Sequence, residues 1–262
     1  MPHADSPALA LDPTRRPKQG AVRVGGDELP LDRAFRWEKE RGGRNFLIQP
    51  TGGGAVRVWT WAQAMDEARR MASYLRSLDL PAGTAIGILT KNCAHFILMD
   101  LAIWMAGHVS VAMYPTLGAD TIRYVLEHSD AKVLFVGKLD EWATQEAGVP
   151  EGVRKISCTL SPKNDFTTWE DIVAKHAPLE GTPRRDAHDR ALLIYTSGST
   201  GQPKGVEHDF YSISAAALGF ATGLGGFMGD ERMLSYLPLA HAFERARSEE
   251  HTSELQSPYV IS

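Results

Sequence analysis

Residues 195–205 (YTSGSTGQPKG) are the part of the sequence best equipped to do chemistry. They hold three glycines, five hydroxyl-bearing side chains and one lysine, Lys204, and they follow the apolar run 191–194, which predicts a buried strand. Glycines and hydroxyls at the end of a strand expose backbone N–H groups and side-chain donors in a tight curve, which suits polyphosphate oxygens. The pattern therefore predicts a phosphate-binding loop in which Lys204 supplies a positive charge.

The Walker A loop of nucleotide triphosphatases has a different order of residues. It requires Gly-x-x-x-x-Gly-Lys-Ser/Thr before a helix. Here Lys204 follows Pro203, and Gly205 stands where that motif has its metal-binding hydroxyl. On composition alone, a flexible surface linker therefore remains an alternative to a phosphate-binding loop.

The order of residues in the run resembles, position by position, the phosphate-loop signature of the adenylate-forming superfamily. This superfamily includes acyl-CoA synthetases, luciferases and the adenylation domains of peptide synthetases. A second segment, 237–245 (LPLAHAFER), resembles the next motif of the superfamily in the form found in long-chain acyl-CoA synthetases. A third, 92–136, is similar to the same enzymes and contains Tyr-Pro-Thr at 114–116. Together the resemblance covers residues 31–246.

The resemblance implies a ligase that activates a carboxylic acid with ATP as acyl-AMP and passes the acyl group to a thiol. The long-chain form of the motifs implies a long-chain fatty acid–CoA ligase, with a fatty acid, ATP and coenzyme A as substrates and Mg²⁺ as the metal. Another carboxylic acid, or the thiol of a carrier protein, stays open as the alternative. The alternative that is not an enzyme is a fragment without catalytic activity.

The resemblance also gives roles to individual residues. The reaction brings a carboxylate to a polyphosphate, so it needs charge neutralisation and alignment. Lys204 and His241 are the catalytic candidates, although a lone histidine on an amphipathic segment is more often a hydrogen-bonded core residue. Thr196 is the candidate Mg²⁺ ligand, opposite an acidic ligand of the family that this chain lacks. The candidates for holding ATP are Thr196, Ser197, Gly198, Ser199, Thr200, Gly201 and Lys204.

Short apolar runs alternate with helical patterns along the chain, which predicts an α/β fold with a mostly parallel sheet and flanking helices. Under the resemblance this is the incomplete N-terminal domain of an adenylate-forming enzyme. Ligands in such sheets bind beyond the carboxyl ends of the strands, where the loop after Tyr195 is expected. The expected strands are 84–89, 109–113, 132–136, 153–157 and 192–195, and the expected helices between them are 93–105, capped by Asn92, and 119–128.

Two further local patterns precede this alternation. The β-prone runs 45–49 and 55–59, separated by Pro-Thr-Gly-Gly-Gly, predict a hairpin. Thr60 and Gln63 then predict a capping box at the start of a helix. We expect the charges of that helix at positions 66, 67, 69, 70 and 76 to form a solvated face, and residues 161–188 to form a surface excursion.

Composition excludes several classes of protein. The net charge of −4, without a basic stripe, argues against a nucleic-acid partner. Cys93 and Cys158 lie too far apart in sequence for a zinc or redox motif, so we expect both to be buried without function, in a reducing compartment. The apolar stretch 93–114 contains Asp100, which favours a buried helix and strand over a membrane span. These features predict a cytoplasmic protein with at most peripheral contact with the inner face of a membrane.

The two ends of the chain differ from the rest. Residues 1–30, rich in Pro, Gly, Asp and Arg, are expected to be a mobile tail without a secretory signal. Residues 31–246 are expected to be a partial AMP-binding domain. Residues 247–262 resemble the in-frame translation of a short-read sequencing adapter, and we interpret them as an artefactual tail; a genuine polar tail is the alternative. Members of the superfamily continue for several hundred residues, so we expect this chain to be the first half of an enzyme and inactive by itself.

Overall fold

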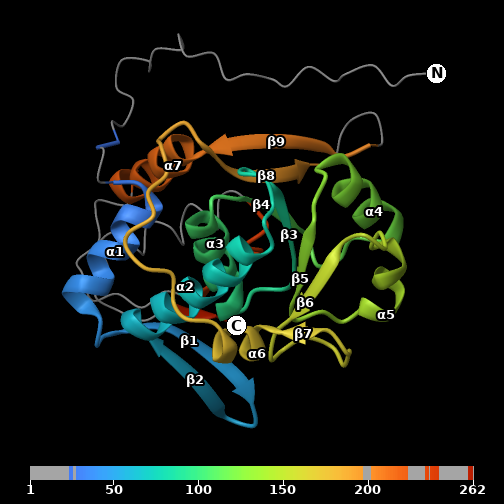
Figure 1. Ribbon diagram of the computed structural model, residues 1–262, viewed down its shortest axis with the longest axis horizontal. Coiled ribbons are helices and arrows are strands. Elements are labelled where there is room, and N and C mark those ends of the chain that lie inside the picture. Colours follow the sequence, from blue (N-terminus) through green and yellow to red (C-terminus); the bar gives the residue numbers. More distant parts are fainter. Residues whose placement is uncertain are drawn as a thin grey trace.

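A computed structural model describes residues 24–25, 28–196, 202–223, 234–235, 237–241 and 259–261. The larger of its two sheets has seven strands in the order β7-β6-β5-β3-β4-β8-β9 (Figure 1). Neighbouring strands are parallel, except that β9 runs antiparallel to β8. The strands are β3 (Ala85–Leu89), β4 (Val109–Met113), β5 (Val133–Val136), β6 (Arg154–Ser157), β7 (Thr167–Thr168), β8 (Arg190–Thr196) and β9 (Lys204–Asp209).

The predicted mostly parallel sheet is confirmed, because each expected strand matches an observed strand to within a few residues. The central strands are apolar and fully buried, which is typical of a sheet covered on both faces. Strand β9 was not predicted. Its sequence, KGVEHD, is polar and partly exposed because it lies at the edge of the sheet, so it gives no apolar run.

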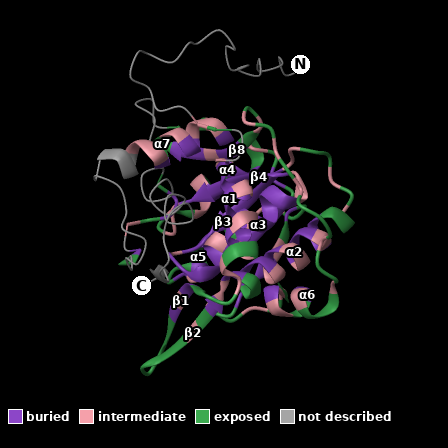
Figure 2. Ribbon diagram, turned by 90° about the vertical axis from the view of Figure 1, so that its left-hand side faces the viewer, coloured by how far each residue is buried: buried purple, intermediate pink, exposed green. Residues whose placement is uncertain are grey.

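Helices cover both faces of this sheet (Figures 1 and 2). On one face, Ile86 and Ile88 of β3 share a core with α1, α2 and α3; on the other, Ala85 and Leu89 share a core with α4 and α5. The two-residue period of the strand thus divides its side chains between two apolar layers. The helices are α1 (Pro30–Arg41), α2 (Trp61–Ser77), α3 (Ala94–Ala106), α4 (Ala119–His128), α5 (Trp142–Gln145), the 3₁₀ turn η1 (Glu146–Gly148), α6 (Trp169–Lys175) and α7 (Phe210–Gly223).

The smaller sheet has the strand order β10-β11-β1-β2. Strands β1 (Asn45–Gly52) and β2 (Ala55–Thr60) form the predicted antiparallel hairpin, whose tip is exposed (Figure 2). Strands β10 (Leu234–Ser235) and β11 (Tyr259–Ile261) pair in parallel with each other, and β11 pairs in parallel with β1. Strand β11 belongs to the segment 247–262, whose interpretation as an artefactual tail stays a prediction.

Helix α2 confirms one prediction and corrects another. Its capping box is present, since Gln63 N donates to Thr60 Oγ1 (3.3 Å) and Thr60 N donates to Gln63 Oε1 (2.9 Å). The expected solvated face is wrong. Glu67 accepts hydrogen bonds from Trp59 Nε1 (2.9 Å) and Trp169 Nε1 (3.1 Å), because β2 and α6 pack on that face.

The same packing corrects the reading of residues 161–188 as a surface excursion. This stretch contains β7 and α6, and the side chain of Trp169 in α6 is fully buried. The polar residues around it hid a short helix with only two buried side chains, Trp169 and Ile172.

Helix α3 is buried over most of its length and ends at Gly107, whose φ of 93° places it in the left-handed region that favours glycine. The expected cap by Asn92 is wrong. Cys93 occupies the cap position, and Gln49 of β1 accepts the N–H of Ala94 at Oε1 (2.9 Å). Among the described residues, no helix is both long and apolar enough to cross a membrane.

Candidate nucleotide-phosphate site

The phosphate-loop run connects β8 to β9 as an antiparallel hairpin. Thr196, the last residue of β8, pairs directly with Lys204, the first residue of β9. Residues directly opposite each other in an antiparallel pair place their side chains on the same face, so the side chains of Thr196 and Lys204 leave the same face of the hairpin. Both residues are exposed. The remaining candidates in the loop, Ser197, Gly198, Ser199, Thr200 and Gly201, lie outside the described residues.

Tyr195 anchors this hairpin to the body of the domain. Side chains alternate along a strand, so Tyr195 points away from the face of Thr196 and is buried at 6% exposure. Its hydroxyl lies 2.8 Å from Nδ1 of His128, at the end of α4. Burial, together with the nearby Tyr124 hydroxyl, raises the pKa of Tyr195 to about 12, so its phenol is neutral at physiological pH.

Gly205 packs closely against the opposite strand. It pairs with Tyr195 across the hairpin, and a Cβ atom at Gly205 would lie 3.3 Å from the Tyr195 ring and 3.2 Å from Cδ1 of Leu193. The hydrogen of glycine therefore lets β9 approach β8 closely. This contact fixes the position of the neighbouring Lys204 relative to Thr196.

The second motif is held by a buried asparagine that the sequence did not single out for this role. Asn92, which follows β3, donates through Nδ2 to Ser235 Oγ (2.9 Å) and to the carbonyl oxygen of Leu237 (2.6 Å). Its Oδ1 accepts the N–H of Leu239 at 2.9 Å. His241 follows this clamped segment; its N–H donates to the Pro238 carbonyl, and the residue is exposed. Residues 242–245 of the motif lie outside the described residues.

All three segments that carry the resemblance meet at one edge of the sheet. Strands β3, β4 and β8 are adjacent and parallel, so their carboxyl ends lie together. Asn92 follows β3, residues 114–116 follow β4, and Thr196 ends β8. The ligand-binding edge expected for such a sheet therefore coincides with the edge where the motifs gather.

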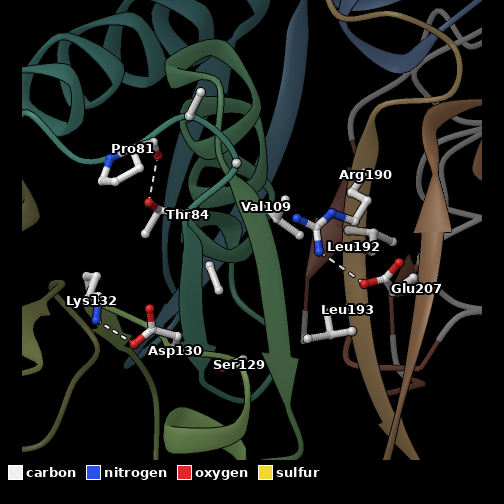
Figure 3. Close-up of a pocket in the computed structure, with 13 residues that line it drawn as sticks. Pro81, Thr84, Val109, Ser129, Asp130, Lys132, Arg190, Leu192, Leu193 and Glu207 are labelled. Atoms are coloured by element: carbon white, nitrogen blue, oxygen red, sulfur yellow. Dashed lines mark hydrogen bonds and ion pairs between the residues drawn. The ribbon is translucent and has the colours of Figure 1, made fainter. Parts of the chain in front are cut away.

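A cavity of about 260 Å³ lies at the opposite edge, among the amino ends of β3, β4, β5 and β8 (Figure 3). Its charged groups neutralise one another. Lys132 Nζ lies 2.5 Å from Asp130 Oδ1, and Arg190 Nη1 lies 3.1 Å from Glu207 Oε1. We assign no ligand to this cavity, because both of these cations already have carboxylate partners.

The part of the chain that the structure describes contains no cluster of three or more His, Cys, Asp or Glu side chains able to hold a metal ion. Thr196 offers one oxygen donor beside the cation of Lys204. A hard cation such as Mg²⁺ takes oxygen ligands and is commonly held through substrate phosphates. The residues present thus fit an ion that arrives with a polyphosphate better than a resident metal.

The α/β fold and the gathered motifs are those expected of the adenylate-forming superfamily. The family described as AMP-binding enzyme matches residues 34–249, and the chain belongs to this family.

Curated relatives support the long-chain form of the motifs. The chain is 34% identical over 227 residues to the long-chain-fatty-acid–CoA ligase FadD15 of Mycobacterium tuberculosis, a match that covers 82% of the chain and 37% of that protein. It is 32% identical over 209 residues to fatty acyl-CoA synthetase A of Dictyostelium discoideum, covering 74% of the chain and 31% of the relative. The chain thus spans about a third of the length of these relatives.

Solved structures share the fold. A fatty acyl CoA synthetase of Mycobacterium tuberculosis superposes with a TM-score of 0.73 at 19% identity, covering 90% of this chain and 45% of that one. A benzoate CoA ligase from Burkholderia xenovorans superposes with a TM-score of 0.74 at 21% identity, covering 89% and 45%. The predicted superfamily and the predicted fold class are both confirmed.

Proposed function

We propose that the protein to which this chain belongs joins a fatty acid to coenzyme A, using ATP and forming acyl-AMP on the way. The observation that carries the proposal is the meeting of the three motif segments at one sheet edge. The sequence relatives that share these segments are named as fatty acid–CoA ligases or synthetases. The benzoate CoA ligase is similar to this chain in fold alone, which does not favour an aromatic acid as the substrate.

The proposed role of the β8–β9 hairpin is to neutralise and align phosphate. A carboxylate approaching the α-phosphate of ATP is repelled by the charges of the triphosphate. Lys204, with no ion pair to any residue that the structure describes, is available to offset that charge. We assign the β- and γ-phosphates to Lys204 together with the hydroxyls and backbone amides of residues 197–201.

Thr196 is the proposed oxygen ligand of Mg²⁺. Bound there, the ion supplies further neutralisation of phosphate charge and orients the nucleotide. The task of this chain is to hold the hydroxyl on the same face as Lys204, which the strand pairing achieves.

His241 is proposed to line the acid side of the site. The proposal is supported by the hydrogen bonds from Asn92, which tie the segment before His241 to the end of β3, at the sheet edge where the hairpin begins. From there the imidazole can orient the acyl carboxylate by hydrogen bonding.

The test is acid-dependent release of pyrophosphate by the complete protein with palmitate, ATP and Mg²⁺, followed by acyl-CoA formation on addition of coenzyme A. Palmitate should support both steps, whereas benzoate should support neither. Activity only with an aromatic acid, or only with a carrier-protein thiol, would replace the proposed substrate class. The absence of acid-dependent pyrophosphate release with all these acids would refute the ligase proposal.

The 262-residue chain by itself is proposed to be inactive, since it spans about a third of the relatives' length. Purified chain incubated with palmitate, ATP and coenzyme A should yield no acyl-CoA, and turnover would contradict this. We also propose a cytoplasmic location with at most peripheral membrane contact. Fractionation of cells should recover the complete protein in the supernatant or in a salt-extractable membrane fraction.

A further inference from the structure

Two cysteines that are distant in sequence meet in the core, outside the candidate site. Cys93 occupies the N-cap of α3, and Cys158 directly follows β6. Both are free and buried, as expected from the sequence, and their thiols lie close enough to affect each other's ionisation. Their spacing in the sequence did not indicate that they meet. Strands β3 and β6 end at the same sheet edge with only β5 between them, which brings the two residues together.

Contacts of the neighbouring residues locate the pair independently. His95, two residues after Cys93, places Nε2 3.3 Å from Oε1 of Glu170. Thr159, the residue after Cys158, donates its N–H to the same carboxylate oxygen at 3.3 Å. The segments that carry the two thiols therefore converge on one Glu170 oxygen.

The surroundings favour a nucleophilic sulfur at Cys93. The interaction with Cys158 is the main cause that lowers the pKa of Cys93, against the opposing effect of burial. The hydroxyl of Thr90 lies 3.5 Å from the Cys93 sulfur. The position at the start of α3 adds the positive end of a helix dipole. Interaction with Cys93 and burial raise the pKa of the Cys158 thiol, so Cys93 loses its proton before Cys158.

The pair lies under a thin cover. Thr159 is exposed and the Glu170 side chain is 37% exposed, so solvent reaches the residue beside Cys158. Hydrogen peroxide is smaller than a protein thiol or glutathione disulfide, so it requires the smallest local opening of the segment after β6.

We propose that Cys93 and Cys158 are a redox-active thiol pair that hydrogen peroxide converts into a reversible intramolecular disulfide. The Cys93 thiolate attacks one oxygen of the peroxide, the O–O bond breaks, and the departing hydroxide takes a proton to become water. Cys93 is then a sulfenic acid. The Cys158 sulfur displaces its hydroxyl group as a second water. Two thiols and one peroxide thus give one disulfide and two waters, and the two electrons of the thiols reduce the peroxide.

The disulfide would form next to the candidate site without belonging to it. Asn92, whose side chain clamps residues 235–239, precedes Cys93 directly. Closing the bond therefore acts on the backbone that carries the clamp. The pairing itself does not depend on the proposed ligase function and is tested without an activity assay.

The test uses the folded chain, fully reduced and then treated with hydrogen peroxide for increasing times. After catalase has removed the peroxide, free thiols are alkylated in denaturant and peptides are mapped by mass spectrometry without reduction. The expected result is the joint loss of both thiols, a linked peptide that contains Cys93 and Cys158, and recovery of both thiols with dithiothreitol.

A single-cysteine variant separates pairing from independent oxidation. In Cys158→Ser the resolving thiol is absent, so Cys93 should accumulate as a sulfenic acid that dimedone traps, whereas the unaltered chain should give little of this adduct. Cys158→Ala serves the same purpose if the serine variant does not fold. Both thiols staying free in peroxide would overturn the proposal. So would separate oxidation of each without a linked peptide, or disulfide-linked dimers in place of the internal bond.

Discussion

At the carboxyl edge of the seven-stranded sheet, Lys204 stands exposed beside Thr196 with no ion pair to a described residue. At the amino edge, a cavity is present, but its Lys132 and Arg190 are each neutralised by a carboxylate. The edge with the cavity has its charges satisfied, and the edge with the motifs has a cation available. In a chain that spans a third of the length of its relatives, the available charge and the cavity thus indicate different edges, and the proposed site lies at the edge with the available charge.

The largest expected effect comes from removing that cation. Lys204→Ala in the complete protein should lower acid-dependent pyrophosphate release about 10²-fold, because one preorganised charge that stabilises phosphate is lost. Lys132→Ala, which removes an exposed lysine of the amino edge, should change the rate less than about twofold, since its surface ion pair contributes little. Equal losses in the two variants would remove the distinction between the edges.

The second largest effect is expected at Asn92, whose side chain clamps residues 235–239 at the carboxyl edge. Asn92→Ala should lower the free energy of unfolding of the complete protein by about 2 kcal/mol, because it leaves buried groups of a distant segment without partners. Urea unfolding measures this loss, and the acid KM should rise with it.

Asn164 provides the matched control for the clamp. Its side chain also makes three hydrogen bonds, but all join residues within three positions and it is half-buried. Asn164→Ala should cost less than about 1 kcal/mol and leave the acid KM unchanged. If it destabilised the protein as much as Asn92→Ala, the long-range character of the clamp would not matter.

A smaller effect tests Thr196. Thr196→Val keeps the shape and removes the hydroxyl, so half-maximal activity should need about tenfold more Mg²⁺. The measurement is a metal titration of pyrophosphate release at saturating ATP. An unaltered titration would refute the metal role of Thr196. The proposed contribution of the hairpin to catalysis would then rest on Lys204.

The smallest effect is a dependence of stability on pH. Burial raises the pKa of Glu170, but the interactions with His95 and Thr159 outweigh it and lower the pKa to about 2. Because the folded pKa is below the ordinary value of about 4.5, the ionised carboxylate stabilises the fold above that pH, and this contribution is lost as pH falls towards 2. Since Glu170 is partly exposed, we expect about 1 kcal/mol at pH 7.

Unfolding of Glu170→Gln at a series of pH values checks this sign. The variant should be less stable than the unaltered protein at pH 7, and the difference should shrink below pH 4.5. Glu207→Gln at the amino edge removes an exposed ion pair and should change stability at pH 7 by less than Glu170→Gln. A difference for Glu170→Gln that grows on acidification would contradict the assignment.

The sequence was sufficient for features that are encoded locally. The buried strands appear as short apolar runs and the start of α2 as a capping box, because each depends on residues close together in the chain. The location of Thr196 and Lys204 followed from the order of residues in one loop. Their roles in binding stay predictions.

What the sequence did not predict depends on distant partners. Asn92 before a helix is typical of a cap, and only the fold brings residues 235–239 within its reach. Cys93 and Cys158 show no motif spacing in the sequence, because the order of the strands in the sheet, and not a short loop, brings them near each other. Glu67 was predicted to face solvent, but in the fold it accepts hydrogen bonds from Trp59 and Trp169 of other elements. Local patterns carry no information on such contacts.

The clamp formed by Asn92 sets an order of events during folding. Its partners lie 143 to 147 positions further along the chain. Contacts across such a separation form late, since a long loop must be closed before they contribute. While the chain is being synthesised, β3 and α3 leave the ribosome well before their partner segment exists, so the Asn92 amide must remain hydrated until Leu239 arrives. The segment that precedes His241 therefore becomes ordered later than β3, to whose end it is tied.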